Sequence, residues 1–333
     1  MLRIDNMWTK YFFIAILFLY NNLNIAQIKS ILPSEIQWKQ LLAKGTDILF
    51  LGGKDKELVV YSNLEKKNIC SIKNGNAYAI IGSNTEIVAF HQKSEGDSNY
   101  YTEIDIYNYK GVKLKNIKIP NVQLVCDATY SEILKEFVFA HINIEDYYKG
   151  VLEDGITTVK VNSFNGTKLN VSKKCKQDPP PNSINLPLIT VSDKIFLCFK
   201  NQYLIDVYSK KGIKLFELSN NNYKHKPYSK KEISCLDGME RAYAVENQNY
   251  PSILQKLCIP DKRTVMVFRK IRPCTEVLYA DFFSSDNGKF LETRHYKLNW
   301  KDKIIDIIVA NKFIYVLTKN RESNEYVLNK FTL

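Results

Sequence analysis

The sequence predicts an all-β protein, a single six-bladed β-propeller, on three observations. Aromatic residues reach 12% and hydrophobic residues 45% of the 333-residue chain, and abundant Ile, Val, Tyr and Phe suit half-buried pleated strands. A unit of alternating apolar strand, aromatic residue, short polar turn and second strand recurs along the chain. Further apolar segments precede each copy, so each unit supplies three or four strands, as a propeller blade does.

The recurring unit is clearest at four turns that contain glycine: Gly111, Gly166, Gly212 and Gly288. Short hairpin turns need a positive φ, which Gly adopts without a Cβ clash and Asn tolerates. A weaker copy upstream has Asn63 and no turn glycine, and another is cut off by the C-terminus. Six units result. Without the first 26 residues, which are discussed below as a signal peptide, 307 residues remain, or about 51 for each unit. This length fits the roughly 40–50 residues of a four-stranded blade.

The ring of blades must close, because a blade buries both of its faces only between two neighbours. The last unit supplies only three strands, at 303–309, 313–319 and 325–332. We therefore expect the N-terminal segment around Ile31–Leu42 to pair into the sixth blade as the closing strand. A helix over part of that stretch, in SEIQWKQLLAK, is the competing prediction.

The first 30 residues have the layout of a secretory signal peptide. A short basic start precedes the apolar run Tyr11–Tyr20, which is shorter than the roughly twenty residues needed to span a bilayer. We expect cleavage after Ala26, although Asn24 is not the small residue usual at its position. Met1 and Met7 both remain candidate start residues.

The predicted organisation has three parts: a signal peptide over 1–26, an N-terminal closing segment over 27–45 and the six-bladed propeller over 46–333. The polar, Pro- and Lys-rich stretches 173–187 and 220–232 are expected to be loops between blades. No second apolar stretch approaches membrane length. We therefore expect a soluble, monomeric protein in the periplasm or outside the cell.

Seven cysteines would meet an oxidising compartment after export. Their odd number leaves at least one unpaired, and the absence of CxxC spacing argues against a zinc or thioredoxin-like site. One or two disulfides are compatible with the sequence, and the pairing stays open. The cysteines are Cys70, Cys126, Cys175, Cys198, Cys235, Cys258 and Cys274.

The pattern of strand, aromatic residue, turn and glycine, as in IDVYSKKGIKLFEL, resembles that of NHL-like six-bladed propellers. Over roughly 40–333 the chain is similar to exported six-bladed propeller proteins of Bacteroidota-type bacteria, and its closing segment over 288–333, from GKFLETRHYKL to NKFTL, is much like the final blades of that family. Many members carry a lipid-anchoring Cys directly after the signal, whereas the first Cys here is Cys70. The resemblance implies a fold and brings no catalytic motif.

The four histidines, His91, His141, His225 and His295, are scattered without HxH or HExxH spacing. A histidine metal site would therefore need long-range convergence. His91 and His141 each follow an apolar strand, which suggests a place near the ends of inner strands. A metal-ligand role is not expected for either.

Other charged groups have a functional and a structural interpretation. The pairs Glu145–Asp146 and Glu153–Asp154 suit calcium or acid–base chemistry, but a solvated loop is the commoner setting. Arg269, Lys270 and Arg272 suggest an anion-binding spot or, more simply, a solvated edge strand.

Two sequons begin at Asn165 and Asn170. They matter only in a eukaryotic secretory pathway.

The net charge of +12 comes from Lys spread along the chain. Without a long basic block or a recognition helix, a nucleic-acid partner is not expected. No nucleophile elbow, P-loop or dinucleotide fingerprint occurs.

We therefore expect a non-enzymatic binding or scaffold propeller, without metal or cofactor, for an unknown protein, peptide or glycan ligand. The alternative is a propeller hydrolase, lyase or lactonase with a metal or carboxylate site in the central channel. Three or more Asp, Glu, Asn or His side chains on the axis would favour that enzyme, and an apolar, aromatic lining would oppose it.

Overall fold

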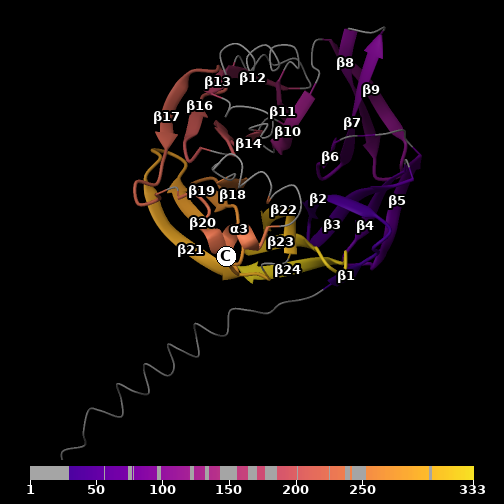
Figure 1. The fold of residues 1–333 in the computed structure, drawn as a ribbon. Coiled ribbons are helices and arrows are strands. Elements are labelled where there is room, and N and C mark those ends of the chain that lie inside the picture. The colour runs from indigo at the N-terminus through magenta and orange to yellow at the C-terminus, as the bar shows by residue number, and fades with distance from the viewer. Residues whose placement is uncertain are drawn as a thin grey trace, which may run out of the picture.

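The structure, a computed structural model, places six four-stranded antiparallel sheets in a ring within the residues it describes (Figure 1). This arrangement confirms the all-β class and the six blades predicted from the sequence. The described residues are 30–55, 57–73, 77, 79–95, 99–120, 124–131, 135–142, 156–163, 171–176, 186–200, 202–224, 226–236, 241, 253–299 and 302–333.

Each of the first five blades is built from four consecutive strands, the first nearest the axis and the fourth at the rim. The first blade contains β2 (Gln37–Lys44), β3 (Asp47–Lys54), β4 (Glu57–Ser62) and β5 (Lys67–Lys73). The second contains β6 (Ala79–Gly82), β7 (Glu86–Glu95), β8 (Asn99–Asn108) and β9 (Lys113–Pro120). The third contains β10 (Leu124–Ser131), β11 (Glu136–Ile142), β12 (Ile156–Ser163) and β13 (Val171–Lys176).

The fourth blade contains β14 (Pro187–Val191), β15 (Ile195–Phe199), β16 (Ile205–Tyr208) and β17 (Lys214–Leu218). A short helix, α3 (Lys230–Ser234), follows it. The fifth contains β18 (Leu254–Asp261), β19 (Thr264–Arg269), β20 (Val277–Ser284) and β21 (Phe290–Lys297). The sixth contains β22 (Asp302–Ala310), β23 (Phe313–Asn320) and β24 (Tyr326–Thr332) and is completed by β1 (Ser30–Leu32).

The ring is closed by the N-terminal strand, as predicted. β1 pairs antiparallel with β24, Ile31 lying opposite Val327, and forms the outer edge of the sixth blade (Figure 1). The closing strand is shorter than the predicted Ile31–Leu42, because the chain from Gln37 onward is already β2 of the first blade. The competing helix is therefore wrong for Gln37–Lys44.

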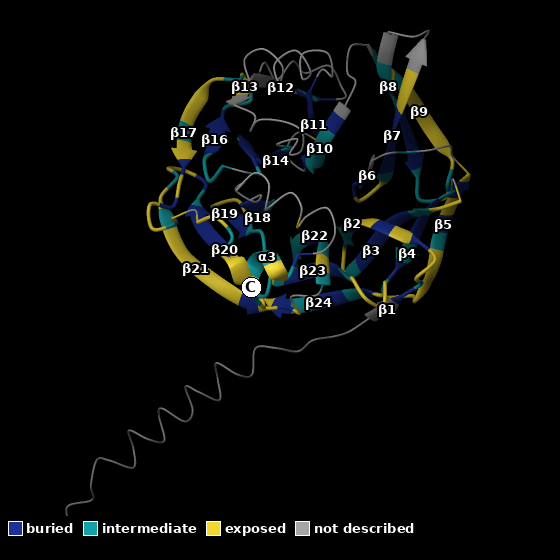
Figure 2. Cartoon of the chain, in the orientation of Figure 1, coloured by how far each residue is buried: buried dark blue, intermediate teal, exposed yellow. Residues whose placement is uncertain are grey.

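Apolar side chains are buried between blades. Six hydrophobic clusters occur among the described residues, and each joins two neighbouring blades. The second strand of a blade is deeply buried, as with Phe50 on β3, Phe139 on β11 and Phe196 on β15, and each such ring contributes about 1.5–3 kcal/mol. Rim strands such as β17 and β21 are largely exposed (Figure 2). Stacking around the ring thus shields faces that a lone blade would expose.

The predicted turns lie between the third and fourth strands of their blades. Gly111, Gly212 and Gly288 adopt positive φ angles of 78°, 81° and 75°, which Gly reaches without strain. In the first blade Lys66 takes the positive φ at 55°. Gly166 lies outside the described residues.

One disulfide is present in the described part of the chain, between Cys235 and Cys274, with Cα atoms 5.8 Å apart. It ties the C-terminal end of α3 to the connection between β19 and β20. Cys70, Cys126, Cys198 and Cys258 are not in disulfides. The side chain of Cys175 is not described.

The signal peptide and its cleavage after Ala26 lie outside the described residues. Over the part of the chain that the structure covers, no helix has the length and apolar character needed to cross a membrane.

Candidate functional site: the central channel

The innermost strands of the six blades line a central channel. Neighbours in the series β2, β6, β10, β14, β18 and β22 contact one another around the ring. Because each is the first strand of its blade, all six run the same way along the axis. Their starts surround a cavity of about 210 Å³, and their ends surround a second cavity of about 470 Å³. A surface pocket of about 200 Å³ shares Lys200 and Gln255 with the first cavity. We call the first cavity and this surface pocket together the N-terminal mouth.

Four of the six innermost strands carry a β-bulge at the same place, as judged from the described residues. A bulge adds one residue and re-aims the side chains around it. The residue after each bulge is polar and lines the channel. These residues are Gln40 on β2, Asp127 on β10, Lys256 on β18 and Asp306 on β22.

Asp306 connects three blades. Its Oδ1 lies 2.8 Å from the Lys256 ammonium of the fifth blade, and its Oδ2 accepts a hydrogen bond from the backbone N–H of Leu41 in the first blade at 2.9 Å. Burial alone would lower the pKa of Lys256, but the charges of Asp306 and Asp127 outweigh it and raise that pKa above its usual value. Lys256 therefore stays charged inside the channel.

Asp127 makes the corresponding connection between the third and fourth blades. Its Oδ2 accepts from the backbone N–H of Ile189 at 2.9 Å, and its Oδ1 accepts from the N–H of Ala128 at 3.0 Å. Burial raises the pKa of Asp127 despite the opposing charge of Lys256. Both channel carboxylates thus bind backbone N–H groups of the next blade in the ring.

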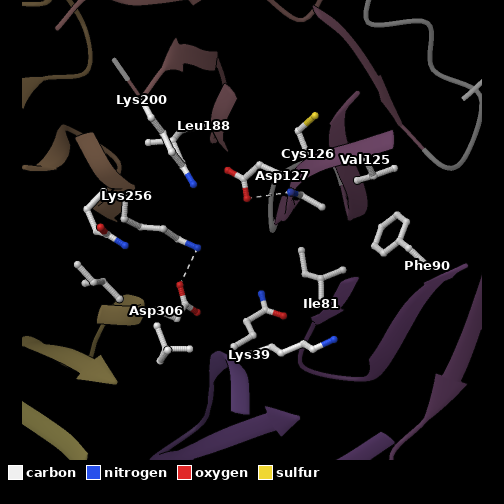
Figure 3. Close-up of a pocket in the computed structure, with 15 residues that line it drawn as sticks. Lys39, Ile81, Phe90, Val125, Cys126, Asp127, Leu188, Lys200, Lys256 and Asp306 are labelled. Carbon is white, nitrogen blue, oxygen red and sulfur yellow. Dashed lines mark hydrogen bonds and ion pairs between the residues drawn. The ribbon is translucent and has the colours of Figure 1, made fainter. Parts of the chain in front are cut away.

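Other polar groups in the N-terminal mouth are not satisfied by the protein. Figure 3 shows Lys200 and Lys256 extending their ammonium groups toward the middle of the cavity, where Asp127 and Asp306 lie. Within the described residues, neither the Lys200 ammonium nor the Gln255 amide has a hydrogen-bond or ion-pair partner. Gln40 Oε1 is buried without a hydrogen-bond donor. Donors and an acceptor are therefore available to a ligand at one place.

The histidines do not meet in the channel. His91 on β7 is buried with Nε2 3.6 Å from Asp105 Oδ2, and His141 on β11 has Nε2 3.2 Å from the Asn162 amide. These are second strands of their blades, one layer out from the axis. Burial, with Lys160 adding repulsion, lowers the pKa of His141 to about 4.

His295 lies exposed on the rim strand β21, and His225 is outside the described residues. Among the described residues, no group of three or more His, Cys, Asp or Glu side chains is placed to hold a metal ion.

Three more buried carboxylates lie away from the channel, and two of them, Asp206 and Asp281, contact a side chain of a neighbouring blade. Asp105, Asp206 and Asp281 occupy the same position on the third strands β8, β16 and β20. The ammonium of Lys173, on the rim strand of the third blade, lies 2.6 Å from Asp206 of the fourth. Each Asp is balanced by a basic side chain, so these groups form part of the blade architecture.

Arg269 and Arg272, which the sequence offered as an anion-binding spot, are engaged by the protein. Arg269 Nε donates to Asp281 at 2.6 Å. Arg272 donates to Glu232 Oε2 at 2.8 Å and to the carbonyl of Pro227 at 2.9 Å, which fastens the segment around α3. Lys270 lines the N-terminal mouth.

The acidic pairs Glu145–Asp146 and Glu153–Asp154 and the sequons at Asn165 and Asn170 lie outside the described residues. Sequence reasoning missed Lys200, Gln255 and the residues that follow the bulges. The residues after the bulges have one sequence signal, a polar residue two places after an apolar one at the start of a blade, as in Ile304-Ile305-Asp306.

Comparison with known proteins adds structural neighbours only. No family model matches the chain, and no curated protein sequence matches it. A member of the DUF4221 family from Bacteroides vulgatus is similar at 10% identity and a TM-score of 0.49, covering 93% of this chain and 97% of that one. A Bacteroides fragilis protein named as exported gives 10% identity and a TM-score of 0.42, with coverage of 93% and 97%. Hsv2 from Kluyveromyces lactis is similar at 13% identity and a TM-score of 0.41, covering 89% of this chain and 85% of that one.

At these identities and TM-scores the neighbours support no functional argument. The six-bladed fold rests on the strand pairing described above.

Proposed function

We propose that this chain is an exported, non-enzymatic binding propeller of the NHL-like type, and that its ligand, a protein, peptide or glycan, reaches into the N-terminal mouth of the channel. The observation that carries the proposal is the set of unsatisfied polar groups there: the Lys200 ammonium, the Gln255 amide and Gln40 Oε1. Buried polar groups are normally paired, so the buried, unpaired Gln40 Oε1 beside the partly exposed Lys200 and Gln255 favours a binding site. The export part rests on the signal-like N-terminus alone.

The rival function, a channel hydrolase, lyase or lactonase, has one favourable observation. Asp127 and Asp306 face the same cavity as Lys256. All four of their carboxylate oxygens, however, already contact a backbone N–H or the Lys256 ammonium. A general base must reach the proton that it abstracts, and these carboxylates are held in place by the blades. The geometry therefore favours binding over catalysis.

The binding proposal is tested by filling the cavity. Gln255→Trp places an indole where two parts of the N-terminal mouth meet, and Lys211→Trp on an exposed turn is the matched control. A library of peptides, glycans and small metabolites is screened by thermal shift against all three proteins. Ligands that stabilise the native chain and the control but not Gln255→Trp support the proposal, whereas equal stabilisation of all three contradicts it.

The enzyme alternative and the exported location have separate readouts. Turnover of ester, lactone or glycoside substrates that disappears in Asp127→Asn would favour catalysis. N-terminal sequencing of the mature protein, produced with its own leader in a bacterium, is expected to begin at Gln27. Retention of residues 11–20 would contradict export by cleavage.

A further inference from the structure

The two ends of the channel differ in charge. The residues that line the N-terminal mouth include seven Lys or Arg against three carboxylates, Asp127, Asp302 and Asp306. The cavity at the other end is balanced, with Lys256 and Lys262 against Asp261 and Asp306. The general Lys richness of the chain would affect both ends alike. The excess of positive charge is therefore a local property of the N-terminal mouth.

Several of these charges are already neutralised inside the protein. Lys256 pairs with Asp306, and Arg272 pairs with Glu232. The carboxylate of Asp127 is held by two backbone N–H groups. Lys200 is different, because it is a half-buried residue whose ammonium points into the cavity and makes no hydrogen bond or ion pair among the described residues. The charge of Asp127 attracts this ammonium, but basic side chains outnumber carboxylates around the N-terminal mouth, so the site attracts a further anion.

The groups around Lys200 limit what that anion can be. The Gln255 amide can donate a hydrogen bond beside the ammonium, and the buried Gln40 Oε1 can only accept one. A ligand that satisfies all three needs an anionic head group and a hydroxyl or amine donor. All three groups line the first cavity, which at about 210 Å³ is smaller than the roughly 300–1,000 Å³ of pockets for drug-sized ligands.

We propose that the N-terminal mouth recognises a compact anion, a carboxylate or phosphate head group on a hydroxylated carrier of about monosaccharide size, with Lys200 as its ion-pair partner. The inference rests on the binding function proposed above and names its ligand class. Gln255 donates to the head group, and Gln40 accepts from a hydroxyl of the carrier. A free small molecule and the acidic end of a glycan share this chemistry.

Calorimetric titration with three sugars of one size tests the charge requirement. D-glucuronate carries a carboxylate, D-glucose 6-phosphate carries a phosphate and D-glucose is neutral. We expect at least one of the two anions to bind, with D-glucose at least about tenfold weaker, a difference of about 1.4 kcal/mol. The stronger anion identifies the head group.

Two substitutions test the assigned residue. Lys200→Gln keeps a polar chain of similar reach but removes the charge, and we expect it to weaken the anion by at least about tenfold. Lys211→Gln removes one charge from an exposed turn and is expected to bind as the unaltered protein does. The Lys200 backbone carbonyl, which accepts from the N–H of Leu254 at 2.9 Å, is retained in both variants. Near-ultraviolet circular dichroism checks that each is folded.

The outcomes separate this inference from the binding function on which it rests. Binding of neither anion, equal binding of glucose, or undiminished binding by Lys200→Gln each overturns the anion assignment. If the library screen still finds ligands that Gln255→Trp excludes, the proposed binding function is supported even though the anion assignment is wrong. If the screen finds none, both fail together.

Discussion

Removal of the Asp306 carboxylate is the sharpest perturbation of the ring. One of its oxygens pairs with Lys256 at 2.8 Å, and the other accepts the Leu41 N–H at 2.9 Å. Asp306 belongs to the sixth blade and Leu41 to the first, so these contacts cross the junction where the two ends of the chain meet. Asp306→Ala deletes both contacts, whereas Asp306→Asn deletes the charge and keeps an oxygen that can accept from Leu41.

The expected magnitudes follow from the burial of each group. The Asp306 side chain is 5% exposed and that of Lys256 is 25% exposed. Breaking a buried ion pair on one side costs about 3–5 kcal/mol, and the partial exposure of Lys256 favours the lower end. We therefore expect Asp306→Ala to lower the free energy of unfolding by about 3 kcal/mol. Asp306→Asn should cost about 1 kcal/mol less, because the backbone hydrogen bond is retained.

Equilibrium urea unfolding of four proteins measures these differences: the unaltered chain, Asp306→Ala, Asp306→Asn, and Asp306→Ala combined with Lys256→Met. The double variant removes the stranded ammonium and should be more stable than Asp306→Ala alone. The reasoning is refuted if Asp306→Ala costs less than about 1 kcal/mol. It is also refuted if removal of the Lys256 charge destabilises the Asp306→Ala protein further.

Three further predictions concern other parts of the structure. Opening the Cys235–Cys274 disulfide, which spans 39 residues, should cost about 4 kcal/mol; dithiothreitol should lower the melting temperature of the unaltered chain but not of Cys235→Ser. His141 has its pKa lowered to about 4 from 6.5, so stability should fall by about 3 kcal/mol as pH drops from 7 to 4, and His141→Gln should remove most of that loss. A Cβ at Gly288 would lie 2.9 Å from Phe216, whereas one at Gly45 meets nothing within 4 Å. Gly288→Ala should therefore unfold at lower urea than Gly45→Ala, since both need a positive φ and only the first adds a clash.

The sequence predicted what depends on local pattern and on counting. Turn glycines such as Gly111 and Gly288 marked the link between third and fourth strands, and three strands in the last unit required a fourth from the N-terminus. Long-range contacts were out of reach. Nothing near Lys200 in the sequence indicates that its side chain lines one cavity with Asp127 and Lys256 of the two neighbouring blades, because that arrangement depends on ring closure. The same holds for the disulfide, whose partners the sequence left open.

The β-bulge explains both why SEIQWKQLLAK resembled a helix and why sequence reasoning missed the channel site. In a regular strand Trp38 and Gln40 would share a face, but their partners on β3 are the consecutive residues Gly52 and Leu51. The extra residue turns Gln40 to the opposite face and brings Leu41 onto the face of Trp38, where both join one hydrophobic cluster.

Apolar residues three apart are a helical signal, so the bulge made a strand resemble a helix. Leu254 and Leu257 repeat the spacing on β18, also within one cluster. One inserted residue therefore places an apolar side chain in the core and turns its polar neighbour into the channel. Deleting Gln255 should leave Leu254 and Lys256 as consecutive residues of a regular β18, still opposite Arg269 and Phe268. The Lys256–Asp306 ion pair should therefore persist, and calorimetric titration should show only the weakening that comes from loss of the Gln255 amide.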